Sequence, residues 1–394
     1  MDPRQNPYAP GAGTPPPELA GRDDLIERAA IALDRIRAAR PARSLILHGL
    51  RGVGKTVLLN RIEVDAEARG LTGLKIEAPE DRSLPALLIP SLRVALLRLD
   101  RAQRARARLI KARRALAGFA KALRVKYKDI EVSTDFEPER GLADSGDLDA
   151  DLTDLMVSVG SAASEYRTAA VLFIDELQYI REDQLASLIR ALHNASQRQL
   201  PVTMLAAGLP QLIGQMGRAK SYAERLFEFV QIDPLDDEAA KTALCVPAKK
   251  EKVTFAQEAI TEILRHTMGY PYFLQEWGRH SWNVAQASPI SGADARRATD
   301  LALAELDAGF FRVRFDRLTP TEKRYLRAMA ELGPGPHRSG DIAQRLQKSV
   351  TSVAPIRNGL IAKGMIYSPA HGDTAFTVPL FDGFMKRIIP EPTT

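Results

Sequence analysis

The sequence predicts an α/β fold with a parallel-sheet core, followed by an all-helical unit and a small C-terminal unit of helices and a hairpin. Three observations support this prediction. Short apolar runs alternate with helical stretches up to about residue 234, which is typical of a parallel sheet. The stretches after Pro234 are helical in pattern. The last segment, from Thr319 onward, has the pattern of short helices followed by two strands.

Length and composition indicate a globular protein with more than one core. A chain of 394 residues is long enough for two or three cores at about 150 residues per domain. Its 45% hydrophobic and 26% charged residues exclude the disordered, fibrous and disulfide-rich classes. The net charge of +6 permits contact with nucleic acid without requiring it. With the single cysteine Cys245 and no apolar run near the roughly 18 residues of a membrane span, we expect a soluble, cytoplasmic protein without a membrane partner.

The first half of the chain contains the predicted sheet. Residues 1–18 are rich in Pro and Gly and are predicted to form a flexible leader. The core is expected over residues 19–234, beginning with a helix in which apolar residues recur at helical spacing. The clearest strands are predicted at residues 44–48, 74–76, 169–174 and 202–206.

Residues 91–160 are predicted to be a charged insertion in this core. The first half is rich in Ala and Arg and helical by propensity, and the second half is rich in carboxylates. Two interpretations stay open. The basic run contacts nucleic acid, or it is a helix that is solvated or paired with the neighbouring acidic block.

The helical unit is expected over residues 235–315 and the C-terminal unit over residues 316–394. Thr319 and Glu322 have the spacing of a capping box at the start of a helix. A third helix is predicted to start near residue 351, with Pro355 in its first turn, and two strands flank a His-Gly-Asp turn after it. This order of elements is that of a winged helix-turn-helix.

Residues 49–56, GLRGVGKT, match the phosphate-binding pattern GxxxxGK[ST] between an apolar strand and a helix-like stretch. Glycines let backbone N–H groups turn toward phosphates, and the N-terminus of the following helix favours their charge. We expect Lys55 to reach the β- and γ-phosphates and Thr56 to bind magnesium. The alternative is a structural glycine-rich turn. The expected nucleotide-binding residues of this loop are Gly49, Gly52, Val53, Gly54, Lys55, Thr56 and Val57.

An acidic pair, Asp175 and Glu176, follows the apolar run at residues 169–174. At the end of a neighbouring strand, Asp175 would hold magnesium and Glu176 would polarise the attacking water. The alternative is a helix N-cap followed by a first-turn acid.

From Leu19 onward, these motifs resemble AAA+ and STAND-type P-loop ATPases, closest to the origin-recognition-complex-like and archaeal-ATPase branch. The stretch Leu19-Ala20-Gly21-Arg22-Asp23 resembles the motif that packs near the adenine, which implies a nucleotide contact for Arg22. Residues 269–271 are similar to the Gly-x-Pro lid motif, in which the proline, here Pro271, approaches the nucleotide. Because a lid arginine is absent at that position, the resemblance favours a switch over a processive motor.

The resemblance implies two further site residues in the core. Gln211, after the third clear strand, stands where a polar residue that senses the γ-phosphate belongs. Arg225 is placed like the arginine finger that a neighbouring subunit supplies, and this implies a homo-oligomer. Arg218 competes with it for that role.

The C-terminal unit resembles the winged helix of the same branch and has a moderately basic face. The residues expected to contact DNA are Lys348, Ser349, Thr351, Arg357 and Lys363. Winged helices also dock on proteins, so both targets stay open.

Taken together, the sequence predicts an ATPase that binds ATP and Mg²⁺ and hydrolyses ATP slowly. The winged helix would couple this switch to double-stranded DNA or to a DNA-bound partner. The alternative is a signalling or defence-type STAND ATPase whose winged helix binds protein. A third interpretation is a DNA-remodelling or loading motor, which would form rings.

Overall fold

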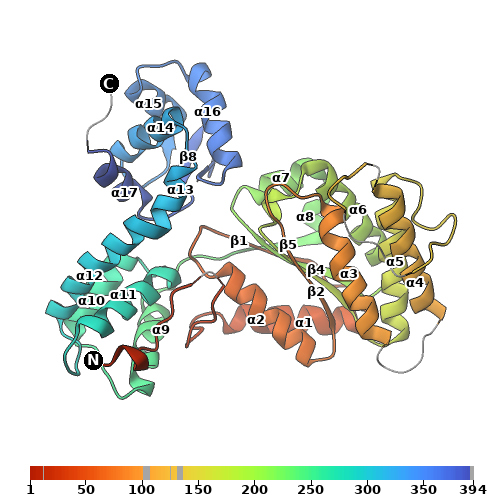
Figure 1. Cartoon of the computed structure of the whole chain (residues 1–394), viewed down its shortest axis with the longest axis horizontal. Coiled ribbons are helices and arrows are strands. Elements are labelled where there is room, and N and C mark those ends of the chain that lie inside the picture. The colour runs from red at the N-terminus through yellow and green to blue at the C-terminus, as the bar shows by residue number, and fades with distance from the viewer. Residues whose placement is uncertain (12, 101–106, 125, 131–135, 391–394) are drawn as a thin grey trace.

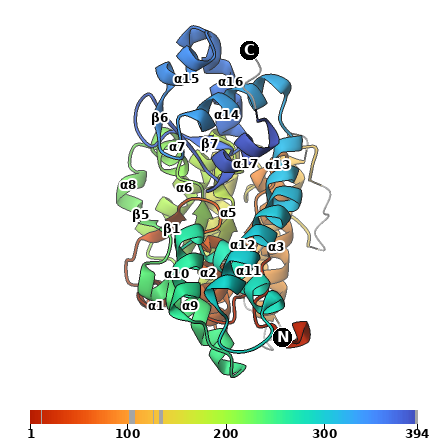
Figure 2. The same ribbon diagram turned by 90° about the vertical axis from the view of Figure 1, so that its left-hand side faces the viewer.

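The computed structural model describes residues 1–11, 13–100, 107–124, 126–130 and 136–390. The chain forms an α/β core, a helical lid and a C-terminal unit (Figure 1). Figure 2 shows the lid helices in front of the core and the C-terminal unit above both. No helix in the described ranges is both long and apolar enough to cross a membrane.

Within the described residues, the core sheet has five strands in the order β2-β3-β4-β1-β5, and every pairing is parallel. Its strands are β1 (Ser44–His48), β2 (Thr72–Glu77), β3 (Ala170–Asp175), β4 (Val202–Gly208) and β5 (Phe227–Gln231). The four strands predicted from apolar runs are confirmed. The edge strand β5 was missed because its Phe-Glu-Phe-Val-Gln sequence is only partly apolar and partly buried.

Helices cover both faces of the sheet, so the inner strands are buried on both sides. Leu45 and Phe173 face a cluster that includes Leu58 and Ile62 of α2, whereas Ile46 and Met204 face the opposite cluster. One face is covered by α1 (Asp23–Arg37) and α2 (Lys55–Ala68). The other is covered by α3 (Leu84–Asp100), α5 (Leu148–Glu165) and α6 (Glu182–Gln197).

The predicted insertion at residues 91–160 does not stand apart from the core. Helices α3 and α5 extend beyond both of its ends and cover the sheet, and α4 (Ala107–Leu123) packs against them. Leu109, Leu116 and Phe119 of α4 are fully buried. On its outer side, Arg114 pairs with Glu139 at 3.5 Å, which is the internal pairing that one interpretation predicted. Residues 101–106, 125 and 131–135 of this segment lie outside the described residues.

The lid is helical, as predicted, and is built around two buried tryptophans. Trp277 and Trp282 are 0% and 1% exposed. Its helices are α9 (Asp237–Lys250), α10 (Gln257–Thr267), α11 (Pro271–Val284) and α12 (Gly292–Leu306). A π-helical segment, η3 (Asp307–Phe311), and the short α13 (Arg312–Asp316) lead from α12 to the C-terminal unit.

Residues 1–11 and 13–18 are not the free leader that the composition predicted, because they pack along the lid. Tyr8 is 3% exposed, and its hydroxyl donates to the carbonyl of Leu244. The indole Nε1 of Trp282 donates to the Asp2 carbonyl at 2.9 Å. A Cβ on Gly278 would lie 2.7 Å from the Tyr8 ring, so a lid glycine makes room for this one aromatic residue. Pro and Gly content alone does not reveal such an anchor.

The C-terminal unit combines helices with a small antiparallel sheet, ordered β6-β8-β7 in the described residues. Its elements are α14 (Pro320–Glu331), β6 (His337–Arg338), α15 (Ser339–Arg345), α16 (Val350–Ala362), β7 (Ile366–Tyr367), β8 (Asp373–Phe376) and α17 (Phe381–Ile388). The predicted capping box is confirmed, since Thr319 and Glu322 exchange both hydrogen bonds.

The third helix of this unit starts within one residue of the predicted position 351, but the prediction that Pro355 lies in its first turn was wrong. Ser349 caps α16 through the N–H of Ser352, so the helix starts at Val350 and Pro355 lies in its interior. The prediction placed the start so that Pro355 would lie in the first turn, whereas Ser349 determines the start as the N-cap. Helix α17 was not predicted, and its Phe381 and Phe384 contact Phe311 at the end of η3.

Candidate functional site

A cavity of about 560 Å³ lies where the carboxyl ends of β1 and β3 meet the lid. This volume lies within the usual range for a small-molecule site. Its core wall contains the predicted residues Gly52, Val53, Gly54, Lys55, Thr56, Val57, Asp175 and Glu176. The opposite wall comes from the leader, α11, η3 and α13, and it includes the predicted residues Arg22 and Pro271.

The loop after β1 has the conformation that its glycines predict. Gly52 and Gly54 have φ of 84° and 90°, which favour glycine. The Lys55 ammonium donates to the carbonyls of Gly49 at 3.0 Å and Leu50 at 2.8 Å, and burial lowers its pKa to about 8. The loop thus presents a half-buried cation at the N-terminus of α2, a favourable place for phosphate. Gly49 contributes its carbonyl and does not line the cavity.

Thr56 and Asp175 meet at the end of β3. The Thr56 hydroxyl and the N–H of Glu176 both donate to the Asp175 carboxylate, the latter at 2.9 Å. Burial raises the pKa of Asp175, so a cation beside it would stabilise the charged form. Hydroxyl and carboxylate oxygens are hard ligands that suit Mg²⁺. The two residues predicted to hold magnesium are therefore together and chemically suited to it.

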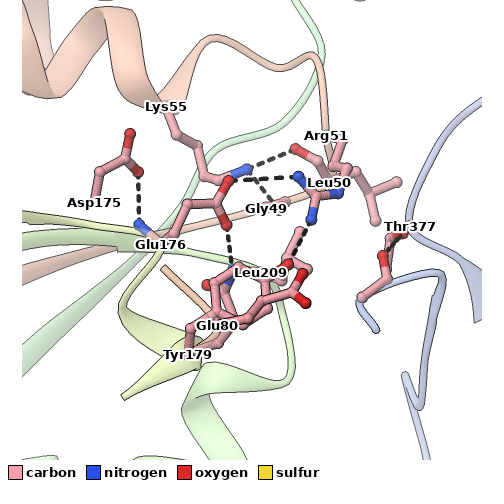
Figure 3. A network of polar contacts seen from close by, with 12 residues as sticks. Gly49, Leu50, Arg51, Lys55, Glu80, Asp175, Glu176, Tyr179, Leu209 and Thr377 are labelled. Carbon is pink, nitrogen blue, oxygen red and sulfur yellow. Dashed lines mark hydrogen bonds and ion pairs between the residues drawn. The ribbon is translucent and has the colours of Figure 1, made fainter. Parts of the chain in front are cut away.

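Glu176 occupies an unusual backbone position at the same strand end. Its φ is 53°, a left-handed conformation that is uncommon for non-glycine residues. The carboxylate accepts from Gln178 and lies 3.4 Å from Arg51. Figure 3 shows these groups around one point near Lys55. The carboxylate is 29% exposed, so it remains accessible to a water molecule.

Arg51, a variable position of the loop motif, was not predicted as a site residue. Its guanidinium donates to the Tyr179 hydroxyl at 3.0 Å, and its backbone N–H donates to the Thr377 carbonyl at 2.9 Å. Thr377 belongs to the C-terminal unit (Figure 3). The phosphate-binding loop is thus bonded directly to that unit. Only the positive charge beside the motif glycines could have suggested a role for Arg51.

Arg22 and the leader line the opposite side of the cavity. The Arg22 guanidinium donates to the carbonyl of Asp233 at 2.6 Å and to that of Val53 at 3.4 Å. Gly13 lies so close to α2 that a Cβ there would be 3.3 Å from the Thr56 methyl group. The leader therefore forms part of the cavity wall, which its composition did not indicate.

The lid reaches the loop through the start of α11. Pro271 is the first residue of that helix, and it lies 4.0 Å from the position of a Cβ on Gly54. The N–H of Tyr272 donates to the Gly52 carbonyl at 3.2 Å. Gly269 has φ of 71°, and a Cβ there would lie 2.1 Å from the Leu235 carbonyl oxygen. The Gly-x-Pro segment thus lies against the loop, and the contact of Pro271 with a nucleotide stays a prediction.

Three predicted core residues lie away from the cavity lining. Gln211 precedes α7 (Leu212–Ala219) at the N-cap position without a side-chain capping bond, and its buried Oε1 has no partner among the described residues. Gln178, which was not predicted, connects the strand ends instead, since its Oε1 accepts from the Leu209 N–H at 3.0 Å. Arg225 is exposed on α8 (Ala223–Leu226), and Arg218 pairs with Glu182 at 3.1 Å.

The structure divides the residues predicted to contact DNA into two groups. Lys348, Ser349 and Thr351 are exposed at the N-terminal end of α16. Arg357 instead donates to Thr374 at 2.9 Å, and Lys363 pairs with Glu322 at 2.7 Å. Each of these two cations already has an acceptor inside its own unit, and their contact with DNA stays a prediction.

Residues 18–205 match the model of the AAA ATPase domain, and residues 308–385 match a domain of unknown function. A comparison with proteins of curated function finds no match. A Walker-type ATPase of Pyrococcus abyssi is similar over 95% of this chain and 97% of its own, with 15% identity and a TM-score of 0.62. The Aeropyrum pernix Orc1 protein in complex with DNA is similar over 94% of each chain, with 15% identity and a TM-score of 0.46. Cdc6p of Pyrobaculum aerophilum covers 99% of this chain and 98% of its own, with 14% identity and a TM-score of 0.46. The structure therefore has the parallel-sheet α/β core of P-loop NTPases, and its residues 18–205 are similar to the AAA ATPase domain.

Proposed function

We propose that this protein is an ATP-binding switch that hydrolyses Mg-ATP slowly and couples its nucleotide state to the C-terminal unit. The observation that carries the proposal is one cavity lined by Lys55, Thr56, Asp175 and Glu176, with a bond from its loop to the C-terminal unit. Lys55 and the N–H groups of the loop bind phosphate oxygens, and Thr56 and Asp175 hold Mg²⁺. Bound Mg²⁺ would neutralise charge on the phosphates.

Glu176 is the group that polarises the attacking water. In the structure the Glu176 carboxylate accepts hydrogen bonds from Arg51 and Gln178. These bonds fix its position before a water molecule is activated. Such engagement supports slow turnover, because a carboxylate that accepts two other hydrogen bonds is a weaker base. The contacts from Arg51 to Tyr179 and Thr377 connect this restraint to the C-terminal unit.

The C-terminal unit is a winged helix that binds double-stranded DNA or a DNA-bound partner. The order and exposure of its elements support this part of the proposal. Helices α14, α15 and α16 precede the β7–β8 hairpin, and the exposed N-terminal end of α16 presents Lys348, Ser349 and Thr351. Side chains at the start of such a helix are suited to base edges and phosphates in a major groove. Arg345 and Arg338 are also exposed on or beside α15.

A second candidate function is a signalling or defence-type ATPase whose C-terminal unit docks on a protein. Arg357 and Lys363 bind acceptors within the unit, and these contacts favour this candidate. They leave two fewer cations available to DNA phosphates on the proposed DNA-binding face. A homo-oligomer in which Arg225 reaches a neighbour's nucleotide is compatible with either function.

Duplex affinity measured with ADP and with a non-hydrolysable ATP analogue tests the DNA proposal. We expect the two nucleotides to give different affinities, and both affinities to fall steeply as salt rises. Lys348→Glu should weaken binding several-fold, and Lys386→Glu, a change at an exposed lysine of α17, is the matched control. No measurable duplex affinity at low salt would contradict DNA binding and favour protein docking.

A further inference from the structure

Arg314, an arginine of the segment between lid and C-terminal unit, is half-buried and has no ion-pair partner among the described residues. Arg314 of α13 lines the cavity, and within the described ranges no carboxylate forms an ion pair with it. Its only hydrogen bond to a described residue goes from Nη1 to the Phe310 carbonyl at 2.5 Å. The other N–H donors of the guanidinium have no partner there. A partly desolvated cation with free donors that faces a cavity is suited to binding an anionic ligand.

Two stacked aromatic rings hold this guanidinium in place. The Tyr272 ring, one residue after Pro271, stacks on Phe310 with 4.7 Å between centroids and 24° between planes. The Arg314 guanidinium carbon lies 4.1 Å from the centroid of the Phe310 ring. Phe310 belongs to the π-helical segment η3, and such segments occur frequently at functional sites. The stack therefore runs from the lid helix that touches the loop to the arginine in the cavity.

Arg314 lies at the catalytic end of the cavity. Burial lowers its pKa to about 10, and Arg51 acts on it in the same direction, whereas Tyr272 and Glu176 act in the opposite direction. The group remains charged at neutral pH. Arg314 also lines a neighbouring hollow with Arg51, Glu176 and Tyr179. Its nearest ionisable neighbours thus include the group proposed to activate water, at the end where the terminal phosphate of ATP would lie.

We propose that Arg314 is the residue of this chain that distinguishes ATP from ADP, by binding the terminal phosphate from the segment that connects the lid to the C-terminal unit. This inference rests on the proposed function and deepens it. The guanidinium donates charge-assisted hydrogen bonds to the γ-phosphate oxygens. Because η3 and α13 lead directly into α14, loss of that phosphate removes a bond that holds the C-terminal unit against the core.

Calorimetric titration with ADP and with adenosine 5′-(β,γ-imido)triphosphate, each with Mg²⁺, tests this inference. For Arg314→Ala we expect about a 10- to 100-fold loss of affinity for the triphosphate, the size typical of a charge-assisted hydrogen bond, and less than about a threefold change for ADP. Arg314→Lys should restore part of the discrimination. The neighbouring Arg312→Ala is the matched control, since Arg312 is exposed and pairs with Asp316 at 3.1 Å.

The outcomes separate this inference from the proposed function. Equal losses for both nucleotides, or no loss for either, would overturn the role of Arg314 while leaving nucleotide binding intact. Binding of neither nucleotide by the unsubstituted protein would overturn the proposed function itself. Thermal unfolding of each variant without nucleotide shows whether it folds. Should Arg314→Ala not fold, Arg314→Lys and Arg314→Gln carry the same comparison of the two nucleotides.

Discussion

The two walls of the nucleotide cavity are built in different ways. The core wall consists of short motifs at the ends of β1 and β3, strands that are buried on both faces. The opposite wall combines the leader, the start of α11, and the segment η3–α13, which lie far apart in the sequence. A few contacts join it to the core, among them the Tyr272 N–H to the Gly52 carbonyl at 3.2 Å.

This difference separates two properties of the site. A wall of buried strands changes little on binding, so the core wall should determine whether a nucleotide binds at all. A wall held by a few polar contacts can open at a small cost in free energy. The opposite wall should therefore determine how well the site distinguishes ATP from ADP and how the C-terminal unit responds to the bound nucleotide. Substitutions on the two walls should therefore change different measured quantities.

The largest effect is expected on the core wall. Lys55→Ala removes the half-buried cation that faces the phosphates, so affinity for Mg-ATP and Mg-ADP should fall by about 100-fold or more. Calorimetric titration measures both affinities. Arg61→Ala on the exposed side of the same helix is the control, because Arg61 is exposed and pairs with Asp65 at 3.1 Å. Unchanged affinity for both nucleotides in Lys55→Ala would show that the loop does not bind phosphate.

A change at Glu176 should affect hydrolysis and spare binding. Glu176→Gln keeps the size of the side chain and removes its basicity, so ATP turnover should fall about 10²- to 10⁴-fold, the usual contribution of a general base. The dissociation constant for Mg-ATP should change little. Phosphate release in the steady state, measured together with affinity, provides the check. Turnover as fast as that of the unsubstituted protein would assign water activation to another residue.

A smaller effect is expected where the leader meets the lid. Gly278→Ala places a Cβ 2.7 Å from the Tyr8 ring. We expect Tyr8 and the leader to detach from the lid, although alanine favours the helix more than glycine does. Limited proteolysis should then cut near the N-terminus faster than in the unsubstituted protein. Gly217→Ala is the matched control, because a Cβ at Gly217 of α7 meets open space. Equal cleavage rates for both variants would indicate that Tyr8 does not hold the leader.

The smallest effect is expected where the C-terminal unit meets the core at the surface. Arg317 and Glu80 form an ion pair at 2.7 Å, with side chains 53% and 43% exposed. Exposed pairs contribute about 0–1 kcal/mol, so Glu80→Ala should change the free energy of unfolding by less than about 1 kcal/mol. Denaturant titration measures the change. A loss of several kcal/mol would mean that this pair, and not the contacts of Arg51, holds the unit in place.

The core wall was predictable from the sequence because its determinants are local. An apolar strand, a loop with positive-φ glycines and the following helix are adjacent in the chain, and the structure places Lys55 and Thr56 as expected. Asp175 and Glu176 were found for the same reason, since an acidic pair directly follows an apolar run. Parallel pairing then brings the two strand ends to one edge of the sheet.

The other wall depends on contacts between distant segments, which no local pattern reveals. Tyr8 is a single aromatic residue in a Pro- and Gly-rich stretch, and its burial depends on a glycine 270 positions later. Arg314 is one of several arginines after η3, and only the stack on Phe310 directs it into the cavity. Arg357 and Lys363 looked free for DNA because their acceptors, Thr374 and Glu322, belong to other elements.

Steady-state ATP turnover with and without duplex DNA tests the central claim most directly, with Lys55→Ala protein as the blank for contaminating ATPases. The account predicts slow, magnesium-dependent phosphate release that disappears in Lys55→Ala and changes when duplex DNA binds the C-terminal unit. Turnover that persists in Lys55→Ala would contradict the assignment of the cavity as the ATP site. Turnover that depends on Lys55 but is indifferent to duplex DNA would contradict coupling to DNA.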